Sequence, residues 1–262
     1  MYNFDFTRPS TIKDAVAAIG AGGQALSGGQ TLIPTMKARL AMPETLVSLT
    51  GIQEMKGICT NDAGQICIGA ATTHAEVARE VAKSYPALSD LAGHIGDPAV
   101  RNRGTIGGSL ANNDPSACYP SAVLGSGAVV KTNSREIAAD DFFQGMFTTA
   151  LEEGEIITEV KFPVPQKANY QKFVQPASRF ALVGVFVAKF ADGVRVAVTG
   201  ASGEGVFRWT EAEAALSKDF TAAALDGVAA PSADGMISDL HGTGAYRAHL
   251  VKVMTARAVA AA

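Results

Sequence analysis

The chain has 262 residues, of which 47% are hydrophobic and 18% charged, a composition that allows one large or two moderate globular domains. Its formal net charge of −3 argues against a dedicated nucleic-acid surface, which is normally strongly basic. No apolar run approaches the ~18 residues of a membrane span, and residues 1–6 lack the basic start and apolar core of a secretory signal. We therefore expect a cytoplasmic protein with no transmembrane segment and no nucleic-acid partner.

The cysteines and histidines give no sign of a metal site. Cys59, Cys67 and Cys118 are too scattered for a CxxC-type spacing, and we expect reduced, mostly buried thiols. An iron–sulfur cluster normally takes four thiolates, so this chain alone cannot hold one. The four histidines occur in no HxxxH or HExxH pattern. We predict no bound metal.

Helices and short strands alternate in the first half of the sequence. Ser10 is the expected N-cap of a first helix, whose buried face has apolar residues at helical spacing from Ile12 to Ile19. A capping box of Thr73 and Glu76 predicts a helix that runs to about Lys83. The other elements expected in this half are a strand at 24–26, a helix at 32–40, strands at 45–49 and 65–69, a helix ending near 92, and strands at 128–131, 136–138 and 155–162.

Pro163-Val164-Pro165 is the best candidate for a domain boundary, because the sequence after it becomes rich in strands. Residues 170–174, 182–190 and 194–200 have strand composition, with Asp192-Gly193 as the hairpin turn between the last two. An alanine-rich amphipathic helix is expected at about 243–261. We therefore predict a larger α/β part over 1–165, with lobes at about 1–55 and 56–165, and a smaller α+β part over 166–262.

Two glycine clusters are the candidate binding loops: Ser27-Gly28-Gly29-Gln30-Thr31 and Gly104-Thr105-Ile106-Gly107-Gly108-Ser109. Paired glycines let backbone N–H groups approach an anion closely, and the serine and threonine hydroxyls add donors. A helix is expected just after the first cluster, so its positive end would face the same anion. The clusters together indicate a diphosphate held mainly by main chain, although each Gly-Gly alone is also typical of a plain turn.

Sequence motifs for chemistry on a substrate are missing. The chain contains no GxGxxG, no GxxxxGK[ST] and no GxSxG. The stretch 93–115 is rich in glycine and polar residues, too polar for a core element. We predict a nucleotide-type binding site and no catalytic residue.

The glycine clusters belong to longer segments with a family resemblance. Residues 27–34 and 36–40 resemble the AGGxSLxPxMKxRL signature of the FAD subunit in the molybdenum hydroxylase, or xanthine dehydrogenase, family. Residues 100–111 are similar to the second FAD signature of that family, VRNxGTIGGxLA. Shorter family-like segments lie at 154–160, 176–181 and 246–250. The resemblance therefore spans essentially the whole chain, and within the family it is greatest to the carbon monoxide dehydrogenase medium chains.

This resemblance implies a fold, a cofactor and a set of contact residues. The fold is α+β: a two-lobed FAD-binding domain of the vanillyl-alcohol-oxidase (PCMH) type, then a smaller α+β C-terminal domain of the carbon monoxide dehydrogenase flavoprotein type. The cofactor is FAD. The implied contacts are Ser27, Gly28, Gly29, Gln30, Thr31 and Leu32 around the diphosphate and ribityl chain, Ile95, Gly96, Thr105, Gly107 and Gly108 on the other side, Ile157 as an apolar contact, and Asn112 and Cys118.

The chain departs from the family pattern at two places. Many relatives carry an aspartate at the position of Cys118, and that aspartate is expected to hydrogen-bond the cofactor. A thiol is a weak donor and poor acceptor, so flavin affinity or potential is expected to differ here. Relatives also place a lysine near the flavin in the C-terminal part, where ungapped counting puts Gln175, with Lys172 the nearest lysine.

The resemblance implies an electron-transfer component rather than the subunit that binds substrate. A large molybdenum-cofactor subunit would oxidise the substrate, and a small [2Fe–2S] subunit would relay electrons to FAD in this chain, which passes them to NAD, a quinone or another acceptor. The implied assembly is a dimer of such heterotrimers. Two alternatives remain open: a stand-alone FAD-dependent oxidase of the same cofactor-binding fold, and a flavin-free scaffold.

Overall fold

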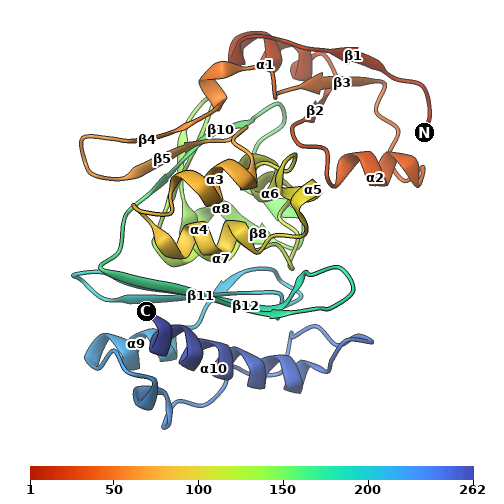
Figure 1. Ribbon diagram of the computed structural model, residues 1–262. Helices are drawn as coiled ribbons and strands as arrows, with labels where there is room; N and C mark the ends of the chain where they lie inside the picture. The colour runs from red at the N-terminus through yellow and green to blue at the C-terminus, as the bar shows by residue number, and fades with distance from the viewer.

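The computed structural model describes residues 1–262, which form stacked layers of sheet and helix (Figure 1). The first layer is a parallel sheet with strand order β1-β3-β2. Helices α1 and α2 supply the crossover connections that parallel strands require. The elements of this layer are β1 (Asp5–Thr7), α1 (Ile12–Gly20), β2 (Gln24–Leu26), α2 (Leu32–Lys37) and β3 (Thr45–Ser48).

Both helices of this layer differ from the prediction at one end. Thr11, not Ser10, caps α1, because its extended backbone lets its hydroxyl accept a hydrogen bond from the Asp14 N–H at 3.1 Å. Helix α2 ends three residues earlier than expected. Arg39 adopts a left-handed backbone with φ of 61°, and the Leu40 N–H turns back to the Thr35 carbonyl, which together close the helix.

The second layer is an antiparallel sheet with strand order β4-β5-β10-β6-β7. Helix α6 packs against β10 of this sheet, and α3, α4, α6 and α7 pack against one another in the same hydrophobic core. The capping box predicted at Thr73 and Glu76 is present at the start of α3. The elements of this layer are β4 (Ile58–Thr60), β5 (Ile66–Gly69), α3 (His74–Glu80), α4 (Pro86–Gly93), α5 (Pro98–Arg101), α6 (Ile106–Asn112), α7 (Tyr119–Ser126), β6 (Val129–Thr132), β7 (Glu136–Ala138), α8 (Ala139–Phe142) and β10 (Ile157–Phe162).

Helix α6 corrects the prediction that the stretch 93–115 holds no core element. Two adjacent glycines disfavour a helix by propensity. Here Thr105 caps the helix by accepting from the Gly108 N–H, and Ile106 and Leu110 are fully buried. Tertiary packing therefore overrides the intrinsic preference of the sequence.

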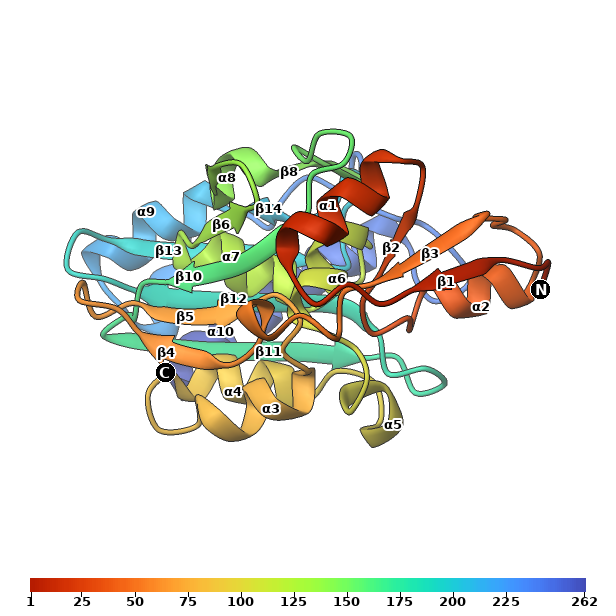
Figure 2. The ribbon, with the colours of Figure 1, turned by 90° about the horizontal axis from the view of Figure 1, so that it is seen from above.

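The third layer is an antiparallel sheet with strand order β11-β12-β13-β14. The hairpin predicted at Asp192-Gly193 joins β12 to β13. Helices α9 and α10 cover one face of this sheet, and α4 and α7 cover the other (Figures 1 and 2). The elements are β11 (Lys167–Val174), β12 (Ala181–Lys189), β13 (Val194–Thr199), β14 (Phe207–Arg208), α9 (Thr210–Lys218) and α10 (Gly244–Ala261).

The core runs without a break across the proline-rich segment at 163–165. Tyr170 of β11 and Phe186 of β12 belong to the same hydrophobic cluster as Phe162 of β10. Tyr85 packs edge-on against both Phe162 and Phe186. The division into domains at about residue 165 therefore stays a prediction.

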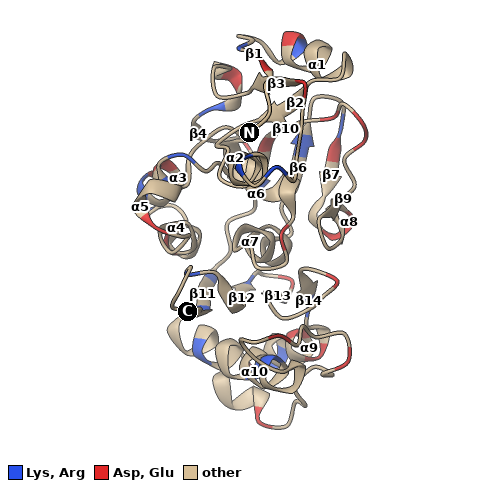
Figure 3. Cartoon of the chain, turned by 90° about the vertical axis from the view of Figure 1, so that its right-hand side faces the viewer, with Lys and Arg blue, Asp and Glu red and all other residues tan.

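The remaining elements are short. A small hairpin of β8 (Phe143–Gly145) and β9 (Thr148–Thr149) projects beside the second layer, and short 3-10 turns lie at Gln53–Met55 and Ala222–Leu225. Charged residues are coloured mainly on the outer elements, whereas α7 in the centre has none (Figure 3). The helices are all too short or too polar to cross a membrane.

Candidate functional site

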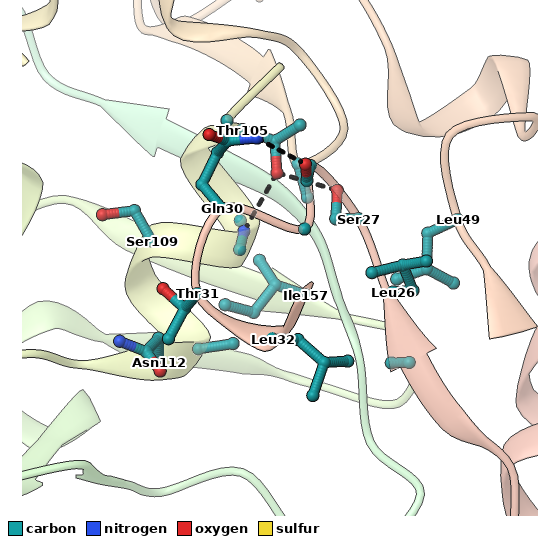
Figure 4. A pocket seen from close by; sticks show the side chains of 18 of the residues that line it. Leu26, Ser27, Gln30, Thr31, Leu32, Leu49, Thr105, Ser109, Asn112 and Ile157 are labelled. Atoms are coloured by element: carbon teal, nitrogen blue, oxygen red, sulfur yellow. Dashed lines mark hydrogen bonds between the residues drawn. The ribbon is translucent and has the colours of Figure 1, made fainter. Parts of the chain in front are cut away.

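A cavity of about 670 Å³ lies between the first layer and the helices of the second. Its volume is within the ~300–1,000 Å³ typical of cofactor and ligand sites. Eleven of the fourteen residues predicted to contact the cofactor line it, and they come from segments more than a hundred residues apart. These eleven are Ser27, Gly28, Gly29, Gln30, Thr31, Leu32, Thr105, Gly107, Gly108, Asn112 and Ile157. Figure 4 labels Ser27, Gln30, Thr31, Leu32, Thr105, Asn112 and Ile157 among them.

The first glycine loop, residues 27–31, lines this cavity and has free backbone donors. None of the five N–H groups from Ser27 to Thr31 donates to another group of the chain. Gly29 adopts φ of 71°, a backbone conformation that side chains disfavour. Unpaired N–H groups on a glycine turn form a concave site for an anion. Because α2 has only six residues, these amides rather than a long helix dipole make the site.

The second glycine loop, residues 104–109, uses its amides inside the protein. Ile106 and Gly107 donate to the carbonyls of Thr72 and Ala70, and Gly108 donates to the Thr105 hydroxyl. Gly107 is required for close packing, because a Cβ there would lie 2.6 Å from the Ala70 Cβ. This loop is a scaffold that offers side chains, such as Ser109, to the cavity.

The two loops are in direct contact. The hydroxyls of Ser27 and Thr105 are hydrogen-bonded at 2.7 Å (Figure 4). A Cβ on Gly28 would lie 2.1 Å from the Arg103 carbonyl oxygen, so only glycine fits between the loops. The scaffold loop thereby fixes the position of the loop with free donors.

The cavity wall contains no lysine or arginine. Its titratable residues are His74, Asp114 and Glu155. Glu155 is occupied: it accepts hydrogen bonds from Arg135, Thr132, Ser134 and the Glu152 N–H. The bonds from Arg135 contribute most to lowering the pKa of Glu155 to about 2. A bound diphosphate would therefore be held by neutral donors, as the sequence predicts.

Three of the predicted contact residues do not line the cavity. The carbonyls of Ile95 and Gly96 accept hydrogen bonds from the Arg101 guanidinium, both at 3.0 Å, and so stabilise the α4–α5 turn. Cys118 is only 5% exposed. It precedes α7 and lies in the core beside Tyr170, whose pKa burial raises well above its usual range. The cofactor contacts expected of these three residues gain no support from their positions.

The lysine expected near the flavin also has another partner. Lys172 donates from its Nζ to the His94 carbonyl at 2.9 Å, outside the cavity. Gln175 is hydrogen-bonded to His241 at 3.0 Å. Neither residue lines the cavity.

Sequence reasoning missed several residues of the wall. Phe180 comes from the connection between β11 and β12 and is the residue that the third layer contributes. It lies in the family-like segment 176–181, which could have indicated that Phe180 belongs to the site. His74, Asp114 and the apolar Leu26 and Leu49 carried no signal, because only folding brings them to this wall.

Comparisons with known proteins agree with this geometry. Residues 2–165 match the family described as "FAD binding domain in molybdopterin dehydrogenase". The chain is 34% identical to the carbon monoxide dehydrogenase medium chain of Afipia carboxidovorans, over 98% of this chain and 96% of that one. It is 32% identical to the nicotine 6-hydroxylase medium subunit of Paenarthrobacter nicotinovorans, over 97% and 95% of the two chains.

Solved structures give the same result. A chain of the reconstituted CO dehydrogenase from Oligotropha carboxidovorans matches with a TM-score of 0.90 and 32% identity, over 99% of this chain and 97% of that one. A chain of quinoline 2-oxidoreductase from Pseudomonas putida 86 matches with a TM-score of 0.89 and 28% identity, over 100% and 97%. These matches confirm the predicted α+β fold, the assignment as an oxidoreductase component, and FAD as the cofactor.

Proposed function

Because the chain belongs to the family of FAD-binding domains of molybdopterin dehydrogenases, we propose that it is the electron-transfer subunit of a molybdenum-containing hydroxylase. In this role residues 1–165 bind FAD, with lobes at about 1–55 and 56–165, and residues 166–262 form the C-terminal domain. The observation that carries the proposal is the loop 27–31, whose residues line a cavity of about 670 Å³ and whose backbone N–H groups have no partner within the chain.

The residues present fit a dinucleotide cofactor. The free amides of residues 27–31 and the hydroxyls of Ser27 and Thr105 provide donors for a diphosphate. Apolar side chains such as Leu32 and Ile157 supply the contact surface for a planar ring. Cavities that combine an apolar lining with a few polar groups are typical of cofactor sites.

Bound FAD supplies redox chemistry: it accepts electrons from one partner and passes them to NAD, a quinone or another acceptor. The chain's own contribution is to bind the cofactor, orient it and exclude water around it. We infer that the electron donor is a small [2Fe–2S] subunit, itself reduced by a large molybdenum-cofactor subunit, in a dimer of heterotrimers. The names of the relatives as medium chains and medium subunits support such partners.

An exposed apolar surface next to the cavity supports a protein partner. Leu40 and Met42 are 81% and 68% exposed, and they follow α2, which lines the cavity through Leu32 and Thr35. The hydrogen bond from the Leu40 N–H to the Thr35 carbonyl, at 3.0 Å, ties Leu40 back to α2. Ordered, exposed apolar residues beside a cofactor site are typical of an interaction surface.

Purification of the chain from its native cells tests the proposal. We expect flavin absorbance bands, together with a molybdenum-containing large subunit and an iron–sulfur small subunit. A lone flavoprotein that oxidises a small alcohol or amine by itself would instead identify a stand-alone oxidase. A colourless chain would identify a scaffold.

The partner surface has its own test. The double substitution Leu40→Glu and Met42→Glu should abolish co-purification of the partners while flavin absorbance stays at the wild-type level. Leu240→Glu is the matched control, because Leu240 is 89% exposed and lies outside this segment. Unchanged co-purification of the double variant would remove the 40–42 segment from the interface.

A further inference from the structure

His74 lines the cavity wall and is neither a predicted cofactor contact nor part of the proposed diphosphate site. It begins α3 and is only 5% exposed. It lines the cavity where the two glycine loops meet. Gly104 makes room for it, because a Cβ on Gly104 would lie 2.5 Å from the imidazole Nε2. A Cβ on Gly28 would in turn lie 2.6 Å from the Gly104 Cα, so Gly104 lies between His74 and the loop with free donors.

The two ring nitrogens of His74 have different surroundings. Nδ1 is sealed from solvent and has no hydrogen-bond partner. Nε2 lies against Gly104, which is itself part of the cavity wall, and it is not among the sealed, unpartnered atoms. The Nε2 edge is therefore the part of the ring that faces the cavity.

The surroundings keep the ring neutral. Burial, followed by the positive charge of Arg101 on α5, lowers the pKa of His74 to about 4. The other titratable side chain in contact is Tyr119 of α7, with ring centroids 5.2 Å apart. Glu76 of α3 is turned toward Thr73, to whose N–H and hydroxyl it is bonded. Asp114 and Glu155 lie elsewhere in the same cavity wall.

A neutral imidazole carries one proton, on either nitrogen. On Nδ1 that proton would be a buried N–H without an acceptor, a state that folded proteins avoid. On Nε2 it becomes a donor that faces the cavity. The sealed Nδ1 thus selects the tautomer with the proton on Nε2.

We propose that His74 donates a hydrogen bond from Nε2 to an anionic oxygen of the cofactor diphosphate, at the junction of the two glycine loops. This inference rests on the proposed function, because it assumes that FAD occupies the cavity. A neutral donor at this point complements the free amides of residues 27–31 in a wall without lysine or arginine. His74 is then a specificity residue for the diphosphate rather than for the flavin ring.

The test compares two substitutions of His74 in the full chain, titrated with FAD and with riboflavin, which has no phosphate. His74→Phe keeps an aromatic ring, although a larger one, and removes the donor, and we expect FAD to bind about tenfold more weakly, or about 1.4 kcal/mol. His74→Gln places an amide N–H near the position of Nε2 and should recover most of that affinity. Riboflavin should bind both variants as it binds the wild type. Tyr119→Phe is the control, because it alters the neighbouring ring without reaching the cavity.

Nitrogen-15 NMR of the imidazole gives an independent readout. The proton should be on Nε2 between pH 5 and 8, with and without FAD. A proton on Nδ1, or equal FAD affinity of His74→Phe and wild type, would overturn the inference while leaving FAD binding in place. Absence of FAD binding by the wild-type chain would overturn the proposed function as well, which separates the two failures.

Discussion

The two glycine loops of the cavity have similar compositions, yet their backbone N–H groups are free in one loop and hydrogen-bonded in the other. In residues 27–31 the N–H groups have no partner within the chain. In residues 104–109 all but that of Thr105 are already bonded, either to other parts of the protein or to Thr105 within the loop. The glycines differ in the same way: Gly29 provides a left-handed turn, whereas Gly107 allows α6 to approach Ala70.

This difference shows that glycine density alone does not identify a ligand-binding loop. A glycine can be required because a ligand must approach the backbone, or because another segment of the chain must do so. What separates the two cases is whether the nearby N–H groups are already paired. The loop 27–31 is a binding element, and the loop 104–109 is the scaffold that holds it.

The largest expected effect comes from adding one methyl group to each loop. In Gly28→Ala the new Cβ would meet the Arg103 carbonyl oxygen at 2.1 Å and push the loops apart, so FAD should bind at least about 100-fold more weakly. In Gly107→Ala the Cβ would clash with Ala70, and the FAD-free chain should lose about 1–3 kcal/mol of stability. Fluorescence titration with FAD and urea unfolding measure the two effects.

Gly20→Ala is the control for both substitutions, because its Cβ would meet nothing within 4 Å. Wild-type FAD affinity in Gly28→Ala would show that the loops are not in contact in solution. The loop 104–109 would then not be the scaffold that positions the loop 27–31.

Glu155 resembles the loop 104–109, because it lines the cavity but its carboxylate is hydrogen-bonded within the protein. Its side chain is 4% exposed, and its pKa lies at about 2 instead of its ordinary 4.5. A depressed pKa contributes stability above pH 4.5 that is lost as the pH falls toward 2. Glu155→Gln should therefore cost about 1.5–3 kcal/mol at pH 7 and less at pH 3.

Urea unfolding at pH 7 and pH 3 measures the difference in free energy of unfolding between the wild type and Glu155→Gln. This difference should be smaller at pH 3. A difference that stays the same at both pH values would show that the charge of the Glu155 carboxylate contributes nothing to stability. In that case Glu155 would be free to act toward the ligand.

The same two loops show how much of the site can be predicted from the sequence. Both are visible as glycine clusters, and the signatures around them predict the cofactor and eleven residues of the wall. The sequence does not reveal which amides are paired, because the partners Ala70 and Thr72 come from a different element. It also hides α6, whose glycines disfavour a helix until Thr105 caps it and the core covers it.

Cys118 illustrates a different limit. The family pattern places a cofactor contact at this position, but a position in a sequence pattern does not say which way the side chain faces. Here it is turned into the core. Ser116 and Ala117, immediately before it, face the cavity instead.

A smaller effect is expected at Phe180, the residue that connects the third layer to the cavity. Phe180 is partly buried and packs edge-on against His241, with ring centroids 5.5 Å apart. Phe180→Ala removes one aromatic contact from the wall, so FAD should bind about two- to tenfold more weakly, with little change in stability. Leu240→Ala, at an 89% exposed neighbour of His241, is the control. Equal affinity of Phe180→Ala and wild type would confine the binding site to the first two layers.

The smallest effect is expected at Cys118, where the family resemblance and the geometry give different predictions. Because Cys118 lies in the core beside Tyr170 and outside the cavity, Cys118→Ser should change FAD affinity by less than about twofold. The buried hydroxyl should cost about 1 kcal/mol of stability. Asp114→Asn is the matched comparison, since Asp114 lies four positions earlier and does line the cavity. A tenfold change of FAD affinity in Cys118→Ser, with no change in Asp114→Asn, would show that Cys118 contacts the cofactor. FAD binding would then have to turn this side chain out of the core.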